Sequence, residues 1–444
     1  MLRISLACLI LALAAACAAP VPNFVVIFTD DHGQGDISAY GAPDVRTPHI
    51  DRLAAEGMTF TRMRANATVC SPSRAALLTG RHADRAGVPG VIRSQPENSW
   101  GYLAPGIPTL ADELKKAGYH SALVGKWHLG LESPNTPNER GFDFFHGFLG
   151  DMMDSYTHHL RHGRNYLRRD TAVIEPQGHA TDLFSRWAVD YLRERAAKPE
   201  QPFFLYLAYN APHFPIEPPA DWLARVKERA PGLDPKRAAN LAFVEHLDDR
   251  IGQVLAALDE TGLAKNTLVV FSADNGGSLP HGQSNLPWRG GKQDHYDGGL
   301  RVPFLARWTG RIAPGSRSDH AGLVFDLFPT FVELAGLKPS PELDAASLLP
   351  ALESRAATAP RDLYFVRREG GPDYGGLAYH ALIRGDWKLM RNDPWSPLEL
   401  YHLGKDPGET TNLTAKEPKV FRQLSAALQG HIQRGGRTPW QKPE

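Results

Sequence analysis

The fold is decided near the start of the chain, by Phe24-Val25-Val26-Ile27-Phe28-Thr29-Asp30-Asp31. Five apolar residues in a row, without alternation, are typical of a strand covered on both faces. Similar runs follow at residues 121–124, 203–209, 267–271 and 302–306. The segments between them have helical periodicity or helix-end residues, at 47–57, 109–118, 181–196 and 235–263. Strands that alternate with helices predict an α/β fold, with a large, mainly parallel or mixed sheet sandwiched by helices.

The final part of the chain has a different pattern. Short apolar runs at 363–366, 379–383, 387–390 and 399–403 are joined by tight turns such as Arg384-Gly385-Asp386, and a helical stretch follows at 418–433. This pattern predicts a smaller antiparallel sheet with one helix. We expect a main α/β domain over residues 20–345 and a C-terminal subdomain over residues 346–444.

The overall charge gives no support for a nucleic-acid partner. The 444 residues contain 49 Lys and Arg against 49 Asp and Glu, so the formal net charge is zero. Nucleic-acid binding requires a clear basic excess. We therefore expect no nucleic-acid partner, although a local basic pocket for an anionic substrate is compatible with this balance.

The first 19 residues have the pattern of a secretory signal peptide. Arg3 precedes an apolar run at 4–13, and small residues follow up to Ala19. The run is short for a transmembrane helix, so we expect no stable membrane span and a secreted or periplasmic protein. Two alternatives stay open: a membrane-anchored start, and a lipoprotein that is acylated on Cys17.

The cysteine count then singles out one residue. The chain has Cys8, Cys17 and Cys70, and cleavage after residue 19 removes the first two. A secreted chain with a single cysteine cannot form an internal disulfide, so Cys70 calls for a chemical explanation.

Polar residues follow four of the predicted strands. They are Asp30 and Asp31, Lys126 and His128, Asn210 and His213, and Asp274 and Asn275. In open α/β sheets, ligands bind beyond the carboxyl ends of the strands, so we expect these groups to share one site. Three carboxylates that meet need a cation, and oxygen-only ligands favour calcium or magnesium over zinc. The alternative is that Asp30-Asp31 caps a loop or a helix start.

Cys70-Ser71-Pro72-Ser73-Arg74 has the pattern of a helix start, with Ser71 as N-cap, Pro72 as the first helical residue and Gly80 as the stop. Cys70 is then placed beside a helix N-terminus, where backbone N–H groups favour negative charge. Arg74 adds a positive charge one turn further on. The alternative is a buried, inert cysteine.

Three cations and two histidines complete the candidate set. Arg74, Lys126 and Lys292 suit a tetrahedral anion, whereas His128 and His213 suit proton transfer near neutral pH. Taken singly, each of these residues is better explained as an ordinary surface group than as a catalyst. Together these residues predict a metal-assisted hydrolase of anionic esters, with sulfate and phosphate both open.

Two longer stretches resemble a known family. Cys70-Ser71-Pro72-Ser73-Arg74, continued by Leu77-Leu78-Thr79-Gly80-Arg81, resembles the signature of the type I, formylglycine-dependent sulfatases, the arylsulfatase-like members of the alkaline-phosphatase-like superfamily. Residues 118–130 resemble the second signature of that family. Further matches lie at 29–31, 47–57, 210–213, 272–276, 290–292, 298–303 and 400–413, so the resemblance covers about 22 to 430.

The resemblance implies a cofactor set and a mechanism. A maturation enzyme would convert Cys70 to formylglycine, and one calcium ion would be held by Asp30, Asp31, residue 70, Asp274 and Asn275. The hydrated aldehyde would attack sulfur, while Lys126 and Lys292 stabilise the sulfate oxygens. His213 would protonate the leaving alcohol, His128 would act as the base that releases sulfate, and Arg74 would position the diol.

The resemblance also implies a substrate class, a sulfated carbohydrate or an aryl sulfate, with a sulfated polysaccharide or oligosaccharide as the expected natural substrate. Cationic residues at 158–164 and the rings of Trp100, Trp288 and Trp395 are candidate sugar contacts, or else solvated loops and core tryptophans. Residues 293–297 and 344–347 depart from the family pattern. Two alternatives remain: a phosphatase or phosphonate monoester hydrolase of the same superfamily, and a non-catalytic glycan-binding relative.

Overall fold

The computed structural model describes residues 21–355, 360–371 and 373–443. Its main body is built on a ten-stranded sheet. The strands lie in the order β12 (Ser316–Ser318), β2 (Met58–Phe60), β11 (Phe304–Arg307), β10 (Thr267–Ala273), β1 (Asn23–Thr29), β9 (Phe203–Ala208), β3 (His120–Lys126), β4 (Phe144–Phe148), β7 (Leu167–Arg169) and β8 (Ala172–Val173). A two-stranded ribbon of β5 (Leu160–Arg161) and β6 (Arg164–Asn165) lies outside this sheet.

The centre of the large sheet is parallel, as the sequence predicts. Strands β10, β1, β9, β3 and β4 all run in one direction, whereas β11 pairs antiparallel with β10, so the sheet as a whole is mixed. Asn23 pairs with Thr267 and Thr29 with Ala273, which brings the carboxyl ends of β1 and β10 to the same level. This register places the residues that follow Thr29, beginning with Asp30, beside the residues that follow Ala273, beginning with Asp274.

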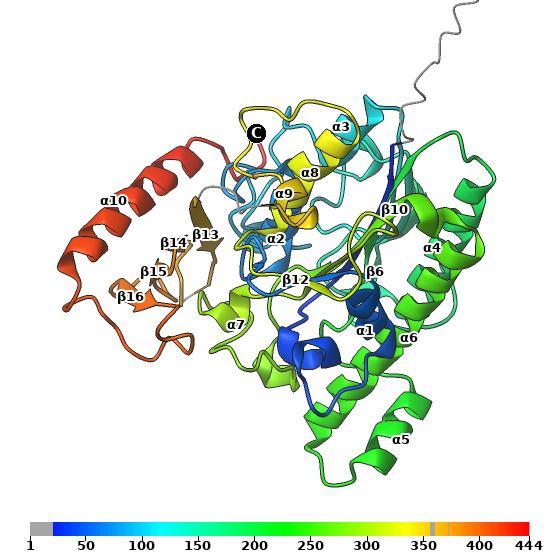
Figure 1. Cartoon of the computed structure of the whole chain (residues 1–444), viewed down its shortest axis with the longest axis horizontal. Helices are drawn as coiled ribbons and strands as arrows, with labels where there is room; N and C mark the ends of the chain where they lie inside the picture. Colours follow the sequence, from blue (N-terminus) through cyan, green and yellow to red (C-terminus); the bar gives the residue numbers. More distant parts are fainter. Residues whose placement is uncertain (1–20, 356–359, 372, 444) are drawn as a thin grey trace, which may run out of the picture.

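Helices cover both faces of the large sheet (Figure 1). One face carries α1 (Pro48–Glu56), α4 (Ala180–Ala196) and α6 (Pro235–Glu260), with α5 (Ala220–Arg229) packed on α6; the other carries α2 (Cys70–Thr79), α3 (Leu110–Lys115) and α8 (Leu327–Leu334). The short helices α7 (Asp297–Leu300) and α9 (Leu349–Leu352) lie in connecting segments. The core lies between these layers: on β1, the ring of Phe24 is buried and stacks on Phe331 of α8, with 4.1 Å between ring centroids. The α/β sandwich predicted from the sequence is confirmed.

The C-terminal sheet is the antiparallel meander that the tail pattern predicts. Its strands are β13 (Asp362–Arg368), β14 (Ala378–Arg384), β15 (Trp387–Met390) and β16 (Glu399–His402). Side chains alternate along β13, because successive residues of a strand point to opposite faces. Phe365 belongs to the core shared with Phe325 of the main body, whereas Tyr364 belongs to the core shared with Leu424 of α10 (Pro418–Gly435). The sheet is therefore held between the main body and α10 (Figure 1).

Buried charges also join the main body to the C-terminal segment, in what we call the inter-sheet ion cluster: Arg64, Asp297, Lys388 and Glu409. The carboxylate of Asp297 lies 2.7 Å from Arg64 Nη2 and 2.8 Å from Lys388 Nζ, and Lys388 Nζ lies 2.7 Å from Glu409. Burial would raise the pKa of Asp297, but the neighbouring Arg64 and Lys388 outweigh it and hold the pKa well below its usual range. Two residues of the main body are thus paired with two of the C-terminal segment.

Three predictions are not settled by the fold. The expected signal peptide, with Cys8 and Cys17, lies outside the described residues. The division at residues 345 and 346 stays a prediction. Within the described part of the chain, none of the helices has the length and apolar character needed to cross a membrane.

Candidate active site

Four oxygen-bearing residues meet where β1 and β10 end. The main-chain nitrogen of Asp31 donates to Asp274 Oδ1 at 3.1 Å, and the side-chain amide of Asn275 donates to Asp31 Oδ1 at 2.7 Å. Asp30, Asp31, Asp274 and Asn275 are all fully buried. Asp31 adopts a left-handed backbone, with φ 58°, which is costly for a residue other than glycine and is common at functional sites. The two strand ends therefore bring together the oxygen donors that the sequence predicts.

Helix α2 brings Cys70 and Arg74 to the same place. The Cys70 sulfur lies 3.1 Å from Asp30 Oδ1, and Arg74 Nη2 lies 2.6 Å from Asp274 Oδ2. Gly80 ends the helix in the left-handed conformation, as predicted. The predicted N-cap was wrong, because the helix begins at Cys70 and the hydroxyl of Ser71 instead accepts a hydrogen bond from the Ile92 nitrogen at 3.0 Å.

Strand β3 delivers Lys126 and His128. The ammonium of Lys126, fully buried, contacts Asp30 Oδ2. His128 Nε2 lies 2.8 Å from the carbonyl oxygen of Ile92, and its Nδ1 is buried without a hydrogen-bond partner among the described residues. Because a carbonyl only accepts, Nε2 carries the hydrogen and Nδ1 is left with a free lone pair.

The segment after β9 and the loop before α7 supply His213 and Lys292. Lys292 Nζ lies 2.8 Å from Asp31 Oδ2 and 2.9 Å from His213 Nε2. His213 Nδ1 lies 2.5 Å from the carbonyl oxygen of Phe214. Since both the ammonium and Nδ1 donate here, His213 Nε2 is the acceptor and the shared proton lies on Lys292.

The mutual burial of these groups sets their pKa values. Burial would raise the pKa of Asp30, but Lys126, His213, Arg74 and Lys292 outweigh it and hold the pKa well below its usual range. Burial, together with the charge of Asp30, raises the pKa of Cys70. Burial and Lys292 lower the pKa of His213 to about 4. Burial and Lys126 hold the pKa of His128 well below its usual range, so both imidazoles are neutral at neutral pH.

Two groups of described residues have the spacing of a metal site. In the first, ligand atoms of Asp30, Asp31, Cys70 and His213 lie within 4.8 Å of one another. The second joins His179, Asp182 and His246. In that group both ring nitrogens of His179 are engaged, with the Glu217 carbonyl and the Thr181 nitrogen. The first group has the better donor set, because the nearby Asn275 Oδ1 is buried and has no hydrogen-bond partner in the described chain.

Sequence reasoning missed the main-chain groups that hold the two histidines. Ile92 fixes His128 through its carbonyl, and the hydroxyl of Tyr156 donates to the His213 carbonyl at 2.9 Å. A main-chain contact leaves no signal in a side-chain pattern. Of the candidate sugar contacts, Trp288 donates to Gln34 at 2.9 Å and stacks under Arg301, so it is a packing residue.

Buried carboxylates and cations at the strand ends of a mixed α/β sheet, with a cysteine at the start of α2 beside them, are the arrangement expected of a hydrolase of anionic esters. Comparison with known proteins identifies the class of ester. A sequence profile described as Sulfatase matches residues 22–337, and one described as N-sulphoglucosamine sulphohydrolase, C-terminal, matches residues 291–435. The chain belongs to the sulfatase family and is a sulfuric ester hydrolase, as the sequence signatures predict.

The similarity to individual sulfatases extends over nearly the whole chain. N-acetylgalactosamine-6-sulfatase of Rattus norvegicus is 36% identical, with 94% of this chain and 86% of the relative covered. Arylsulfatase A of Homo sapiens is 34% identical, with coverage of 94% and 89%. The crystal structure of Ps i-CgsB with k-i-k-neocarrahexaose superposes with a TM-score of 0.86 at 28% identity, covering 95% of each chain. BT4656 in complex with D-glucosamine-2-N,6-O-disulfate shares the fold, with a TM-score of 0.73 at 22% identity, covering 96% of this chain and 100% of that chain.

Proposed function

We propose that this sulfatase hydrolyses sulfate esters of carbohydrates, with a formylglycine made from Cys70 and one bound calcium ion. The observation that supports this most directly is the position of Cys70. Its sulfur lies 3.1 Å from Asp30, in a buried cluster with three carboxylates and the cations Arg74, Lys126 and Lys292. A structural cysteine would be packed among apolar side chains instead.

Calcium fits the donor set at the strand ends. Asp30, Asp31, Asp274, Asn275 and residue 70 would hold it, and the unpaired Asn275 Oδ1 is an oxygen donor that nothing else in the described chain uses. A bound divalent ion supplies positive charge against the developing negative charge of the reacting ester. Three carboxylates balance three cations here, so an added ion makes the centre positive and suited to an anionic substrate.

Formylglycine at position 70 supplies, once hydrated, one hydroxyl that attacks sulfur and a second that allows sulfate to be expelled. The surrounding side chains would hold and orient the reacting groups. Arg74 is fixed by two contacts to Asp274, at 2.6 and 3.0 Å, so its guanidinium stays beside residue 70. Lys126, paired with Asp30, and Lys292, paired with Asp31, would supply positive charge for the sulfate oxygens.

The two histidines would carry the proton transfers. His128 has a free lone pair on Nδ1 and is neutral, which suits the base that takes a proton from residue 70. On the other side, His213 shares a proton with Lys292, and this pair would protonate the oxygen of the leaving alcohol. We propose Lys292 as the source of this proton, since its ammonium lies 2.9 Å from His213 Nε2.

The substrate class is supported by the relatives. N-acetylgalactosamine-6-sulfatases match across more than nine-tenths of the chain, and the similar Ps i-CgsB structure contains k-i-k-neocarrahexaose. We therefore propose a sulfated oligosaccharide or polysaccharide as the natural substrate. The proposal includes maturation by a formylglycine-generating enzyme and export by the segment at 1–19, with periplasmic or extracellular action; acylation of Cys17 remains an alternative.

Peptide mass and sulfate release test this function together. The protein is produced with a formylglycine-generating enzyme, and the peptide containing residue 70 should be about 18 Da lighter than the cysteine form. Sulfate release is then measured from N-acetylgalactosamine 6-sulfate, chondroitin 6-sulfate, k-i-k-neocarrahexaose and 4-nitrocatechol sulfate, with phosphate esters as the comparison. Full activity of the unmodified thiol, or turnover of phosphate esters alone, would contradict the proposal.

A further inference from the structure

A cavity of about 660 Å³ lies beside the candidate active site. It is lined by four segments that are distant in sequence: residues 92–102, 129–135, 164–166 and 440–442. Ligand pockets in proteins are commonly 300 to 1,000 Å³, so this cavity has the size of a site for a small molecule or for a unit of a polymer.

The walls of the cavity are rich in aromatic rings. Trp100 and Trp440 stack on each other with 5.6 Å between ring centroids, and Tyr102 and Tyr166 also line the cavity. Glycine makes room for Trp100, since a Cβ on Gly370 would lie 2.1 Å from Trp100 Cζ2. The indole is therefore held in a fitted position, as expected of a stacking surface for a flat, partly apolar ligand.

The cavity is joined to the catalytic residues through one main-chain segment. Ile92 lines the cavity, while its carbonyl holds His128 at 2.8 Å and its nitrogen donates to Ser71 beside Cys70 at 3.0 Å. Leu129, the neighbour of His128, lines the cavity as well. The main chain of residue 92 thus contacts the catalytic side of the structure while the residue itself lines the cavity.

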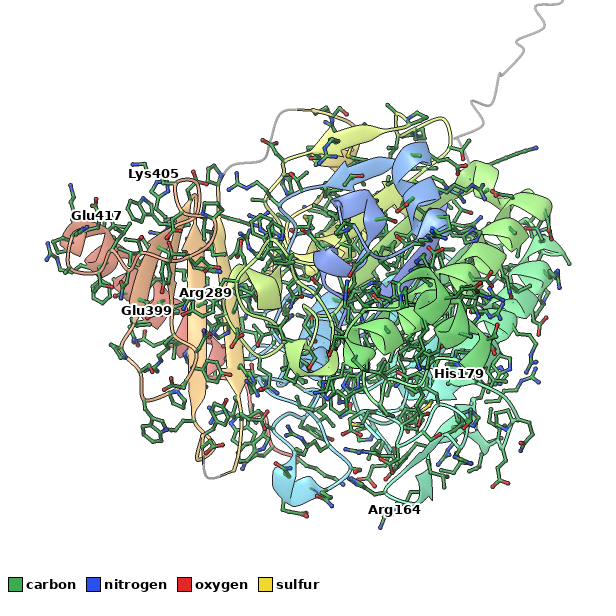
Figure 2. All side chains as sticks on the ribbon, turned by 90° about the horizontal axis from the view of Figure 1, so that it is seen from below. Arg164, His179, Arg289, Glu399, Lys405 and Glu417 are labelled. Atoms are coloured by element: carbon green, nitrogen blue, oxygen red, sulfur yellow. The ribbon has the colours of Figure 1, made fainter. Side chains whose placement is uncertain are left out.

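Two charged side chains at the cavity have no partner among the described residues. Neither Arg164 nor Glu97 makes a side-chain hydrogen bond or ion pair within the described chain, and both are exposed at the cavity wall. Arg164 projects from the lower edge of the molecule (Figure 2). By contrast, Arg93 pairs with Glu369 and Lys442 with Glu132. A free guanidinium beside aromatic rings suits a ligand that combines a ring face with an anionic substituent.

We propose that this cavity binds the sugar unit next to the one that loses its sulfate, in an anionic oligosaccharide. The inference rests on the proposed glycan substrate and adds the site that makes the enzyme prefer an oligosaccharide to a single sugar. The apolar face of the neighbouring sugar stacks on the Trp440 and Tyr102 side, and Arg164 pairs with a sulfate or carboxylate on that unit. Glu97 accepts hydrogen bonds from sugar hydroxyls.

Kinetics against substrate length test this site. The kcat/KM of the matured enzyme is measured on N-acetylgalactosamine 6-sulfate, on a chondroitin 6-sulfate tetrasaccharide and on 4-nitrocatechol sulfate, for wild type, Arg164→Gln and Trp440→Ala. The wild type is expected to favour the tetrasaccharide over the monosaccharide at least tenfold. Each variant should lose most of that advantage and keep its rates on the two small substrates.

Matched controls and a binding measurement make the result specific. Trp395→Ala removes an indole that is 69% exposed and outside the cavity, and Arg169→Gln removes an exposed arginine of the neighbouring strand β7; both should leave the length advantage intact. Calorimetry on a Cys70→Ser background should show at least fivefold weaker binding of the tetrasaccharide, and of k-i-k-neocarrahexaose, when Arg164 is also replaced.

The outcomes separate the cavity from the proposed function. A wild type that gains nothing from length, or variants that retain the gain and the binding, would overturn the cavity proposal while sulfate release from sugars still supports the function. Hydrolysis of 4-nitrocatechol sulfate without turnover or binding of any sulfated sugar would overturn the glycan substrate and, with it, the cavity proposal.

Discussion

Asp297, at the start of α7, and Lys388, on β15, lie 2.8 Å apart with both side chains almost completely buried. This contact joins the main body to the C-terminal sheet. In the sequence, Asp297 follows only a few residues after Lys292 of the candidate active site. Breaking one partner of a buried ion pair is far more costly than removing an exposed pair, because the remaining charge is left without compensation.

Lys388→Met should therefore destabilise the protein by about 3–5 kcal/mol, because Glu409 would be left as a buried anion without a cation, whereas Asp297 keeps Arg64. Urea unfolding measures the change. Arg384→Met is the control, since the Arg384 side chain is 47% exposed and its partner Asp362 keeps a contact with His431, and it should cost less than about 1 kcal/mol. Equal stability losses for the two variants would show that the inter-sheet ion cluster has no special role.

Removal of calcium should lower the melting temperature and abolish sulfate release. An ion that binds only the folded state adds about 2.7 kcal/mol of stability when its concentration is a hundred times its Kd. Melting is followed with EDTA and after calcium is restored. Asp31→Asn should lose the response to calcium, whereas Asp221→Asn, in an exposed pair with Arg225, should keep it. A melting temperature indifferent to EDTA in the wild type would contradict the metal assignment.

His213→Ala should affect poor leaving groups more than good ones. If the Lys292–His213 pair protonates the leaving oxygen, its loss lowers kcat on a sugar sulfate by about 10²–10⁴. The loss on 4-nitrocatechol sulfate should be much smaller, because the phenolate leaves with less need for a proton. Equal losses on both substrates would assign His213 to binding instead of proton transfer.

The protein should become less stable as the pH falls, because buried histidines such as His82 cannot take up a proton in the folded state. Burial lowers the pKa of His82 to about 3, against about 6.5 in an unfolded chain. Above pH 6.5 both states are neutral and His82 contributes no pH dependence. As the pH falls from about 6.5 towards 3, the unfolded state binds a proton that the folded state excludes, and stability drops by about 1.4 kcal/mol per pH unit.

Urea unfolding of wild type and His82→Gln at pH 7.5, 6.0 and 5.0 checks this slope. Whatever its stability at pH 7.5, the variant should show a smaller change in the free energy of unfolding between pH 7.5 and 5.0, because the unfolded state no longer takes up the proton of residue 82. His158→Gln replaces an exposed histidine and should follow the wild type. Parallel pH profiles for His82→Gln and the wild type would refute the assignment.

The parts of the fold predicted from sequence are those with strong local patterns. The central strands could be predicted from unbroken apolar runs such as that of β1. The candidate site could be predicted from the strand-end pairs Asp30-Asp31 and Asp274-Asn275. The short edge strands β12 (Ser316–Ser318) and β8 (Ala172–Val173) were not predicted, because two or three mixed residues carry no periodicity.

Other features could not be predicted because they depend on tertiary contacts. Ser71 has the chemistry of an N-cap, yet its hydroxyl is used by the Ile92 nitrogen, 21 residues away in sequence. The stack of Trp100 on Trp440 joins residues that are 340 positions apart in sequence. Such contacts follow from how distant segments pack, which a local pattern does not encode.

The two-faced C-terminal sheet has a bearing on biosynthesis. Until β13 and β14 have been made, Phe325 and Leu300 lack the apolar face that covers them in the finished molecule. A nascent chain released early, or a product shortened by a premature stop codon, would present this bare surface to other polypeptides. We expect such fragments to aggregate or to bind chaperones. The main body is therefore protected from self-association only after most of the polypeptide, including β13 and β14, has been synthesised.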